Sequence, residues 1–507
     1  MSKSKRRDLI AFYDLNDTII KQGFCTLCGA CEAACPVHAI RIEDHEIQHY
    51  DCSAFLDLCP ICYDICPHTE PLLLETMKFV ADAPFRREAL GYYRQILLAQ
   101  ATDSEIRRLS HSGGVVTAIL MQSLRDGIID GAIVSEAEPS EPLKLKPQIS
   151  LVPDDVLSVV ESKFSPSAVA KAFGNAVREY GKSKIAFVGV PHQILAIRKL
   201  EAWEHKIMQS LELTIGLFCL WAFSLNELLE YLSERFNIEH SEIKRIDLTD
   251  KYVVYVEDRK VEIPMEDVTS HILNKCRTCM DFTAELADIS VGGAYPLSDW
   301  SIVIIRTRKG EEVLNRALEA DAIRTRKIEG ESEVFAHLLS LAVRKRRIAL
   351  EEVKKLQRKG MSIPPVNHAL VFLKNEKSIM ADKKIGDVMS RKVVTVKPEI
   401  TVSQLLDMMA KHHHMGYPVL NENDDLIGVI TFEDVMNVPK ERRNEILVGD
   451  IAKKRLITAY PEDSVLYAFE KMNQYDIGRI LIVDRENHKK LLGIITRSDI
   501  IHALRRV

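Results

Sequence analysis

The chain has 507 residues, 46% of them apolar, which is enough for several packed cores and, by length, about three or four domains. Its 68 basic and 73 acidic residues give a net charge of −5, which argues against a general nucleic-acid binder. The 11 cysteines argue against a disulfide framework, because most of them fall in a regular ladder between positions 25 and 66.

The N-terminus carries basic residues, but no continuous apolar core ends there in a small-residue cleavage site. We therefore predict no signal peptide and a cytoplasmic protein. The longest strongly apolar stretch, residues 214–225, is shorter than the about 18 residues that a membrane span requires. No membrane span is expected.

The first expected element is a small thiol-rich domain over residues 1–80, in which metal replaces a large core. The run from Cys25 to Pro36, C-x2-C-x2-C-x3-C-P, has the spacing of a bacterial ferredoxin loop whose fourth thiolate ligates the neighbouring cluster. The run from Cys52 to Pro67 repeats this ladder with a longer first interval. Cross-ligation then predicts two 4Fe-4S clusters, one on Cys25, Cys28, Cys31 and Cys66 and the other on Cys35, Cys52, Cys59 and Cys62. Structural zinc is the alternative, although a zinc site prefers two separated pairs of ligands.

Beyond a linker near residues 81–85, helical and strand-like patterns alternate. Helices are expected over residues 115–127, 167–181 and 192–203, and strands over 131–135, 184–190 and 211–218. This alternation predicts an α/β domain over residues 86–375 with a largely parallel sheet. Further strands are expected over 252–263, 288–293 and 301–307, followed by a charged helix from about 331 to 359.

Several short segments of this domain carry candidate site residues: Ser110–Ala118, Glu161–Pro166, Gly189–Gln193, Gly216–Cys219 and Cys276–Gly292. In this order and spacing they resemble the coenzyme F-420 hydrogenase/dehydrogenase beta-subunit family, over about residues 10–360. The resemblance implies a flavoprotein that exchanges hydride with an 8-hydroxy-5-deazaflavin. A flavin also suits the chemistry, because a deazaflavin carries hydride whereas an iron–sulfur cluster passes one electron.

The resemblance implies that FAD and the deazaflavin are held by Ser112, Gly113, Gly114, Thr117, Lys163, Ser165, Gly292 and Gly293. The glycine turn at residues 112–114 offers backbone amides and a positive helix end to a pyrophosphate, but such a turn is also common as a plain helix entry. Lys163 would reach a phosphate; the alternative is a solvated surface lysine.

The resemblance also implies a third cluster, with candidate ligands His192, Cys219, Cys276 and Cys279. A histidine ligand would raise the cluster potential, as imidazole does in Rieske centres. The alternatives are that His192 only packs, leaving three ligands or no cluster, and that Cys219 is a small buried hydrophobe in an apolar strand.

Two further runs, one of basic residues and one of histidines, are not expected to bind a ligand. The basic run 344–347, with Lys354, Lys355, Arg358 and Lys359, could steer a polyanionic coenzyme, but the solvated face of an amphipathic helix is favoured. The run His412–His414 lies between a helix and a strand without a thiol or carboxylate partner nearby, so metal binding there is disfavoured.

The last part of the chain contains a repeat of about sixty residues. Gly386–Met389 corresponds to Gly449–Ala452, and each copy ends in Gly-x-x-Thr-x-x-Asp. Two copies suit a pseudo-twofold pair rather than a solenoid. They resemble CBS domains, over residues 384–438 and 446–507, which implies an adenine-nucleotide site for AMP or ATP that uses Thr431, Asp434, Thr496 and Asp499. An empty dimerisation scaffold is the alternative.

The predicted fold class is therefore α/β multidomain: a ferredoxin-like 4Fe-4S domain, an α/β flavoprotein core and a tandem CBS (Bateman) module. We expect an iron–sulfur flavoprotein oxidoreductase that moves hydride between coenzyme F-420 and FAD, and single electrons through the clusters to ferredoxin or another redox protein. The alternatives are a related reductase with another substrate, and an electron-relay and nucleotide-sensing subunit. A homodimer through the CBS pair or a place in a larger complex is expected, with no nucleic-acid partner. No catalytic acid or base is nominated.

Overall fold

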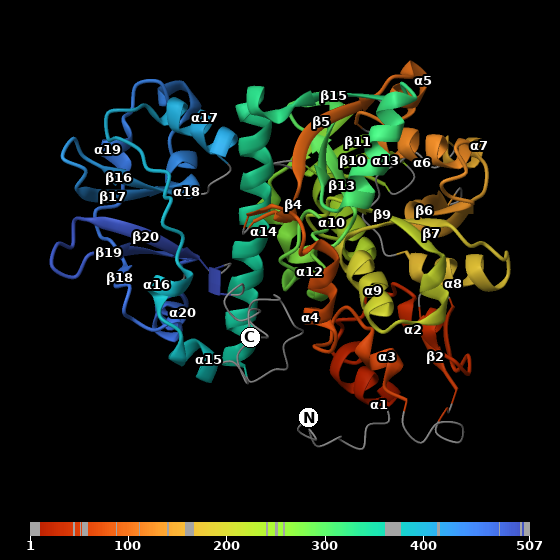
Figure 1. Ribbon diagram of the computed structural model, residues 1–507. Coiled ribbons are helices and arrows are strands. Elements are labelled where there is room, and N and C mark those ends of the chain that lie inside the picture. The colour runs from red at the N-terminus through yellow and green to blue at the C-terminus, as the bar shows by residue number, and fades with distance from the viewer. Residues whose placement is uncertain are drawn as a thin grey trace. The chain divides into compact units, whose positions relative to one another are not determined.

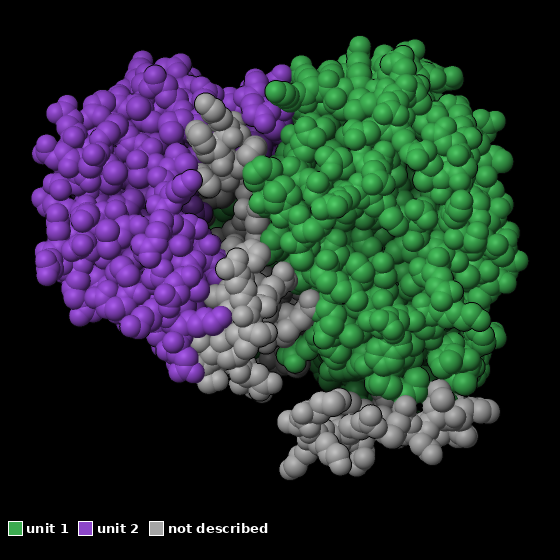
Figure 2. Space-filling model, in the orientation of Figure 1, with its two compact units in different colours: residues 1–85, 89–327, 341–366 green, residues 86–88, 328–340, 367–507 purple. Residues whose placement is uncertain are grey.

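The computed structural model describes residues 11–43, 46–50, 52, 59–87, 89–110, 112–138, 141–157, 167–239, 242–248, 252–256, 259–359, 377–412, 416–475, 477–496 and 499–500. Lys163, Ser165, His413, His414 and the predicted domain boundary near residue 375 lie outside these ranges. The chain divides into two compact units, residues 1–85, 89–327 and 341–366, and residues 86–88, 328–340 and 367–507 (Figure 2).

The thiol-bearing segment of the first unit consists of short elements: α1 (Ala11–Leu15), η1 (Asn16–Ile20), α2 (Ala30–Ala34), β1 (Ile40–Glu43), β2 (Glu46–His49), α3 (Ile61–Asp64), α4 (Leu73–Thr76) and η2 (Met77–Val80). It shares one apolar core with the α/β part, because Ala33 and Ile65 pack in the same cluster as Phe173 and Ile197. The two parts are therefore joined in a single unit, and the guanidinium of Arg178 adds a hydrogen bond to the Ala33 carbonyl at 2.8 Å.

An eight-stranded sheet forms the centre of the first unit, in the order β15-β5-β14-β13-β9-β8-β6-β7 (Figure 1). Its strands are β5 (Gln95–Ala101), β6 (Gly131–Glu138), β7 (Glu141–Ser150), β8 (Ile185–Gly189), β9 (Leu211–Leu217), β13 (Ile289–Ala294), β14 (Leu297–Ile305) and β15 (Ile323–Lys327). Only the central strands β13, β9, β8 and β6 pair in parallel; the pairs toward both edges are antiparallel. The prediction of a largely parallel sheet was therefore correct for the central strands and wrong toward both edges. At one side the reason is local: β13 and β14 are joined by a tight hairpin, which makes them antiparallel and needs no crossover helix.

Helices cover both faces of this sheet (Figure 1). They are α5 (Ser104–Leu109), α6 (Val115–Arg125), α7 (Pro153–Leu157), α8 (Val169–Arg178), α9 (Pro191–Ala202) and α13 (Arg308–Glu319). Strand β8 shows the two-sided burial: Ile185 and Phe187 face the α8 and α9 core, whereas Ala186 and Val188 face the α6 and α13 core. Full burial on both faces explains why this strand has a continuous apolar run.

The other elements that precede α15 are β3 (Phe85–Arg87), β4 (Gly91–Tyr93), η3 (Lys206–Ser210), α10 (Leu225–Phe236), β10 (Ile243–Leu248), β11 (Tyr252–Val256), β12 (Arg259–Ile263), α11 (Met265–Val268), η5 (Thr269–His271), α12 (Asn274–Arg277), η6 (Ile328–Gly330) and α14 (Ser332–Arg358). Most of them belong to the first unit, but Arg86 and Arg87 of β3, η6 and the part of α14 up to Ser340 belong to the second. Strands β10, β11 and β12 form a separate antiparallel sheet. None of the helices in the described part of the chain is long and apolar enough to span a bilayer.

The second unit contains the two repeats. Its elements are α15 (Lys377–Asp382), α16 (Ile385–Val388), α17 (Val402–His412), β16 (Gly416–Leu420), β17 (Leu426–Thr431), α18 (Phe432–Met436), η8 (Lys440–Arg442), α19 (Val448–Ile451), β18 (Thr458–Ala459), α20 (Val465–Gln474), β19 (Arg479–Val483) and β20 (Leu491–Thr496). The copies exchange equivalent hydrogen bonds: the Gly386 amide donates to the Pro461 carbonyl at 2.7 Å, and the Gly449 amide donates to the Pro398 carbonyl at 2.9 Å. This reciprocity is the pseudo-twofold relation expected from the repeat.

Candidate functional site

Four N-terminal thiols form a first group, consisting of Cys25, Cys28, Cys31 and Cys66. Burial raises the pKa of Cys31 well above its ordinary value, and the neighbouring thiols of Cys28, Cys25 and Cys66 raise it further. The pKa of Cys66 is raised in the same way by burial, Cys28 and Cys25. Cys62 makes a smaller contribution at Cys31, so a second group of thiols lies next to the first.

Cys62 itself belongs to the second group. Burial and the thiols of Cys59, Cys35 and Cys52 raise its pKa to about 12. His49 lies beside this group, with Nε2 3.6 Å from the Cys52 sulfur. Crowded buried thiols repel each other once ionised. Bound iron would offset this repulsion, because its positive charge stabilises the deprotonated thiols that ligate it.

Segments far apart in the sequence bring Cys219, Cys276 and Cys279 into a third group. Burial raises the pKa of Cys219 to about 12; the Lys345 ammonium opposes the rise, and the thiols of Cys276 and Cys279 add to it. Cys219 lies just beyond the end of β9 rather than inside a strand, and its amide donates to the Phe282 carbonyl at 2.9 Å. Cys276 lies in α12.

Three buried lysines donate to backbone carbonyls in the loops that carry these thiols. The Lys199 ammonium donates to the Cys66 carbonyl at 2.6 Å, and the Lys275 ammonium to the Cys25 carbonyl at 2.7 Å. Lys345 donates to the carbonyls of Cys219 and Asp281, both at 2.6 Å. Sequence reasoning missed all three. The sequence predicts Lys345 on a solvated helix face, but only 1% of it is exposed.

The electrostatics of the lysines follow from these neighbours. Burial lowers the pKa of Lys199 to about 7, although the Cys66 thiol and the carboxylates of Asp64 and Glu75 oppose the shift. Burial also lowers the pKa of Lys275, and there the nearby thiols oppose it. Burial would lower the pKa of Lys345 too, but the thiols of Cys279, Cys219 and Cys276 outweigh it and hold that pKa above its usual range.

His192 and His68 lie among these lysines, with ring centroids 6.3 Å apart. Burial lowers the pKa of His68 to about 3, with Lys275 and Lys199 adding to the effect. Burial, His68, Lys275 and Lys345 hold the pKa of His192 well below its usual value. His192 Nε2 is buried and has no hydrogen-bond partner among the described residues. A neutral imidazole with an available nitrogen is a competent metal ligand.

The described side chains include no group of three or more His, Cys, Asp or Glu residues arranged to hold a single metal ion. A single zinc ion gathers its sulfurs about 2.3 Å from one centre. A cubane cluster instead distributes its four thiolates over four irons.

The residues suggested for flavin binding are held by packing. Gly114 is the N-cap of α6 with φ of 70°, and a Cβ on Gly113 would lie 2.7 Å from the Ala99 carbonyl oxygen. A Cβ on Gly292 would lie 1.9 Å from the Phe218 ring, whereas a Cβ on Gly293 would meet nothing within 4 Å. The fold alone therefore accounts for glycine at 113, 114 and 292. Only Gly293 leaves open space. Ser112 Oγ lies 3.1 Å from Ser301 Oγ, and Thr117 is buried in α6.

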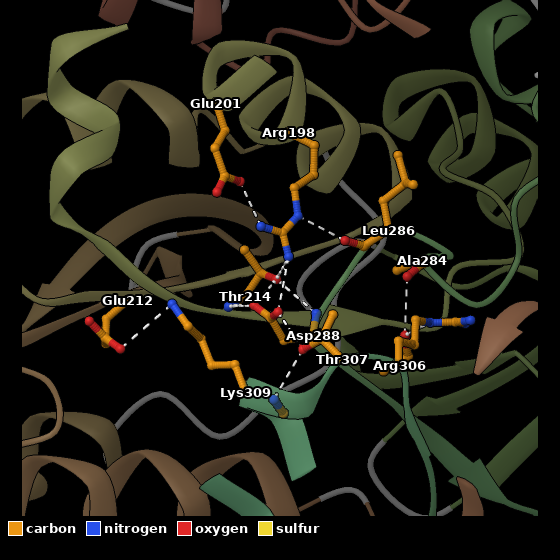
Figure 3. A network of polar contacts seen from close by, with 12 residues as sticks. Arg198, Glu201, Glu212, Thr214, Ala284, Leu286, Asp288, Arg306, Thr307 and Lys309 are labelled. Atoms are coloured by element: carbon orange, nitrogen blue, oxygen red, sulfur yellow. Dashed lines mark hydrogen bonds and ion pairs between the residues drawn. The ribbon is translucent and has the colours of Figure 1, made fainter. Parts of the chain in front are cut away.

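A buried polar network fixes the strands that lead to the third thiol group (Figure 3). The Asp288 carboxylate accepts from the Thr214 amide at 2.8 Å, the Thr214 hydroxyl at 2.7 Å and the Thr307 hydroxyl at 2.7 Å. It also pairs with the Arg198 guanidinium at 3.2 Å. Burial would raise the pKa of Asp288, but Arg198 and these hydrogen bonds hold it below its usual value.

The two proposed nucleotide-contact motifs have the same internal geometry. Asp434 accepts from the Thr431 amide at 2.9 Å and hydroxyl at 2.7 Å, and Asp499 accepts from the corresponding groups of Thr496, both at 2.8 Å. Each carboxylate thus holds the turn between a strand and a helix. Lys453 lies 2.8 Å from the second oxygen of Asp434.

Family profiles match most parts of the chain. For the coenzyme F-420 hydrogenase/dehydrogenase beta-subunit family, residues 96–173 match the profile of the N-terminal part, and residues 182–331 match the profile of the C-terminal part. Residues 18–41 match a 4Fe-4S binding domain, and residues 385–441 and 448–506 match CBS domains.

Individual relatives agree with these profiles. The coenzyme F-420 hydrogenase subunit beta of Methanosarcina barkeri is 30% identical over 274 residues, which is 53% of this chain and 91% of that protein. The coenzyme F-420-dependent sulfite reductase of Methanocaldococcus jannaschii is 30% identical over 340 residues, or 62% of this chain and 49% of that protein. A solved chain of the F-420-reducing nickel–iron hydrogenase complex of M. barkeri is 27% identical with a TM-score of 0.53, and the match covers 56% of this chain and 100% of that one.

Proposed function

Because the chain belongs to the coenzyme F-420 hydrogenase/dehydrogenase beta-subunit family, we propose that it is a coenzyme F-420-linked oxidoreductase in which hydride exchange is coupled to single-electron transfer. The observation that carries this proposal is the gathering of eleven cysteines into three neighbouring groups inside one unit. Three sets of thiols suit a relay of iron–sulfur clusters.

The donor sets fit such clusters. Cys25, Cys28, Cys31 and Cys66 would hold one 4Fe-4S cluster, and Cys35, Cys52, Cys59 and Cys62 a second. The thiols of Cys25, Cys28 and Cys66 raise the pKa of Cys31, and those of Cys35, Cys52 and Cys59 raise the pKa of Cys62, which supports this division. Cys219, Cys276 and Cys279 would hold a third, with the buried Nε2 of His192 as its candidate fourth ligand.

FAD is proposed between the coenzyme and the clusters. When bound, a flavin accepts hydride and releases single electrons, and each cluster passes one electron. The chain's own contribution is positional. Cys219 follows β9 of the central sheet, and its amide donates to the Phe282 carbonyl, which ties it to the segment just after Cys276 and Cys279. Ser112 and Gly293 are the residues with which this chain would approach the cofactor.

The physiological acceptor is proposed to be ferredoxin or another redox protein, reached through the N-terminal thiol groups. The CBS pair is proposed to bind AMP or ATP and so to regulate the redox unit. Such coupling requires that the nucleotide bind two states of the protein with different affinities.

The deciding experiment mixes anaerobically purified, flavin-loaded protein with reduced coenzyme F-420 and a viologen dye. We expect coenzyme oxidation and dye reduction to proceed together, with about twelve irons per chain, as three cubanes imply. No reaction in protein with intact flavin and iron would overturn the proposal as stated.

The match to a coenzyme F-420-dependent sulfite reductase keeps a second candidate open, a related reductase with a different final substrate. Replacing the dye by sulfite distinguishes the two candidates. Only the sulfite-type reductase predicts that sulfite accelerates the oxidation of reduced coenzyme F-420. The CBS matches favour a third, an electron-relay and nucleotide-sensing subunit without turnover of its own. This candidate predicts no turnover until a partner protein is added.

A further inference from the structure

Three buried lysines lie beside two of the three thiol groups, the one that contains Cys66 and the one that contains Cys219. Lys199 is fully buried, Lys275 is 7% exposed and Lys345 is 1% exposed. A buried ammonium is costly unless an anion lies close by. Within the described ranges, none of the three forms an ion pair with a carboxylate, and each donates instead to a carbonyl of a cysteine-bearing loop.

Their hydrogen bonds place them beside particular cysteines. Lys275 lies between two groups, because its ammonium donates to the Cys25 carbonyl at 2.7 Å and it directly precedes Cys276 in α12. Lys345 donates to the carbonyls of Cys219 and Asp281, both at 2.6 Å, and so lies beside the third group alone.

Lys199 donates to the carbonyls of Cys66 at 2.6 Å and Thr69 at 2.8 Å, and so lies beside the first group. Among the described residues, none of the three lysines donates to a cysteine of the second group, which consists of Cys35, Cys52, Cys59 and Cys62.

We propose that Lys199, Lys275 and Lys345 are positioning residues that raise the reduction potentials of the two clusters they adjoin, with Lys275 acting on both. The inference rests on the proposed function, because it requires clusters at these thiols. A cluster gains one negative charge when it takes up an electron, and a fixed positive charge nearby stabilises that reduced form. Hydrogen bonds to the ligand loops hold each ammonium in place, as outer groups commonly do around metal sites.

The pattern of contacts makes the proposal specific. Removing the charge of Lys275 should lower the potentials of two clusters, while removing that of Lys345 or Lys199 should lower only one, and a different one in each case. The cluster of Cys35, Cys52, Cys59 and Cys62 should keep its potential in every variant and so serves as an internal reference.

The test is a redox titration of the intact chain followed by electron paramagnetic resonance, with the variants K275M, K345M and K199M. Methionine fills a similar volume without the charge. The matched control is K171M: Lys171 also donates to a backbone carbonyl of the N-terminal segment, that of Ile42 at 2.9 Å, but it is already paired with Glu32 at 3.0 Å.

We expect each affected cluster to lose at least tenfold in its one-electron reduction equilibrium, which is about 59 mV, and K171M to show no change. Unmoved potentials in a variant with full iron content would overturn the proposal, and so would equal shifts in all three clusters or a shift in K171M. If one variant loses iron, the other two carry the test. Wild-type protein without clusters refutes the proposed function instead, so the two failures are distinguishable.

Discussion

Replacing Asp288 by asparagine tests the polar network that fixes the sheet beside the third thiol group (Figure 3). One oxygen of Asp288 accepts from both the amide and the hydroxyl of Thr214, and the other faces Thr307 and Arg198. In either orientation of an asparagine side chain, its NH2 group faces a donor. The change therefore removes the ion pair and at least one hydrogen bond.

Removing one partner from a buried ion pair typically costs about 3–5 kcal/mol. Arg198 keeps a second partner, Glu201 at 2.6 Å, so we expect the lower end, about 3 kcal/mol. At about 2 °C per kcal/mol for a large unit, the thermal midpoint should fall by roughly 6 °C. Anaerobic thermal unfolding followed by circular dichroism measures this midpoint.

The control is E212Q, because Glu212 and Lys309 form a partly exposed ion pair at 3.6 Å in the same region. It should change stability by less than about 1 kcal/mol. The pKa of Asp288 is held below its unfolded value, so its contribution is present above about pH 4 and is lost as the pH falls through the folded pKa. The gap between wild type and D288N should therefore close in acid. A loss below 1 kcal/mol, or one that E212Q reproduces, would refute this account of the network.

Three further predictions concern the proposed ligands. C66S and C62S should each lose about four irons, and the double variant about eight, because the two thiols serve different clusters; iron and acid-labile sulfide analysis would contradict this if the double variant lost no more than either single one. H192C should keep its iron and show a lower potential for the third cluster, since thiolate replaces imidazole; an unchanged potential would mean that His192 is not a ligand. AMP at about 100 times its dissociation constant should stabilise the second unit by about 2.7 kcal/mol, and D434A and D499A should each reduce the shift in thermal midpoint; no shift in the wild type would refute nucleotide binding.

The local patterns were informative wherever one stretch of chain makes the whole feature. The ladder from Cys25 to Pro36 identified an iron–sulfur segment, and a 4Fe-4S profile matches residues 18–41. The sequence repeat predicted a pseudo-twofold pair of domains, and the equivalent hydrogen bonds of the Gly386 and Gly449 amides join the two copies in this way. The helix expected from about 331 to 359 is α14, Ser332–Arg358. Period and spacing determine such features because their contacts lie within a few turns or residues.

Sequence patterns gave wrong predictions where a strand pairs with another strand that is distant in the sequence. The sheet was expected to be largely parallel, but sequence alternation does not reveal that β5, β14 and β15 add antiparallel strands beside β13. A strand's direction depends on its neighbour, and that neighbour can lie far away in the chain.

The sequence by itself determined the family, the order of the parts and which cysteines are candidates for iron. Only the tertiary structure decided that Cys219 meets Cys276 and Cys279, and that Lys345, within a run that looks solvated, is buried against them. A charged side chain is tolerated inside a protein only when opposite charge or hydrogen-bond acceptors surround it. For Lys345 these come from Cys219 and Asp281, which are distant in sequence, so no local pattern could have revealed its place.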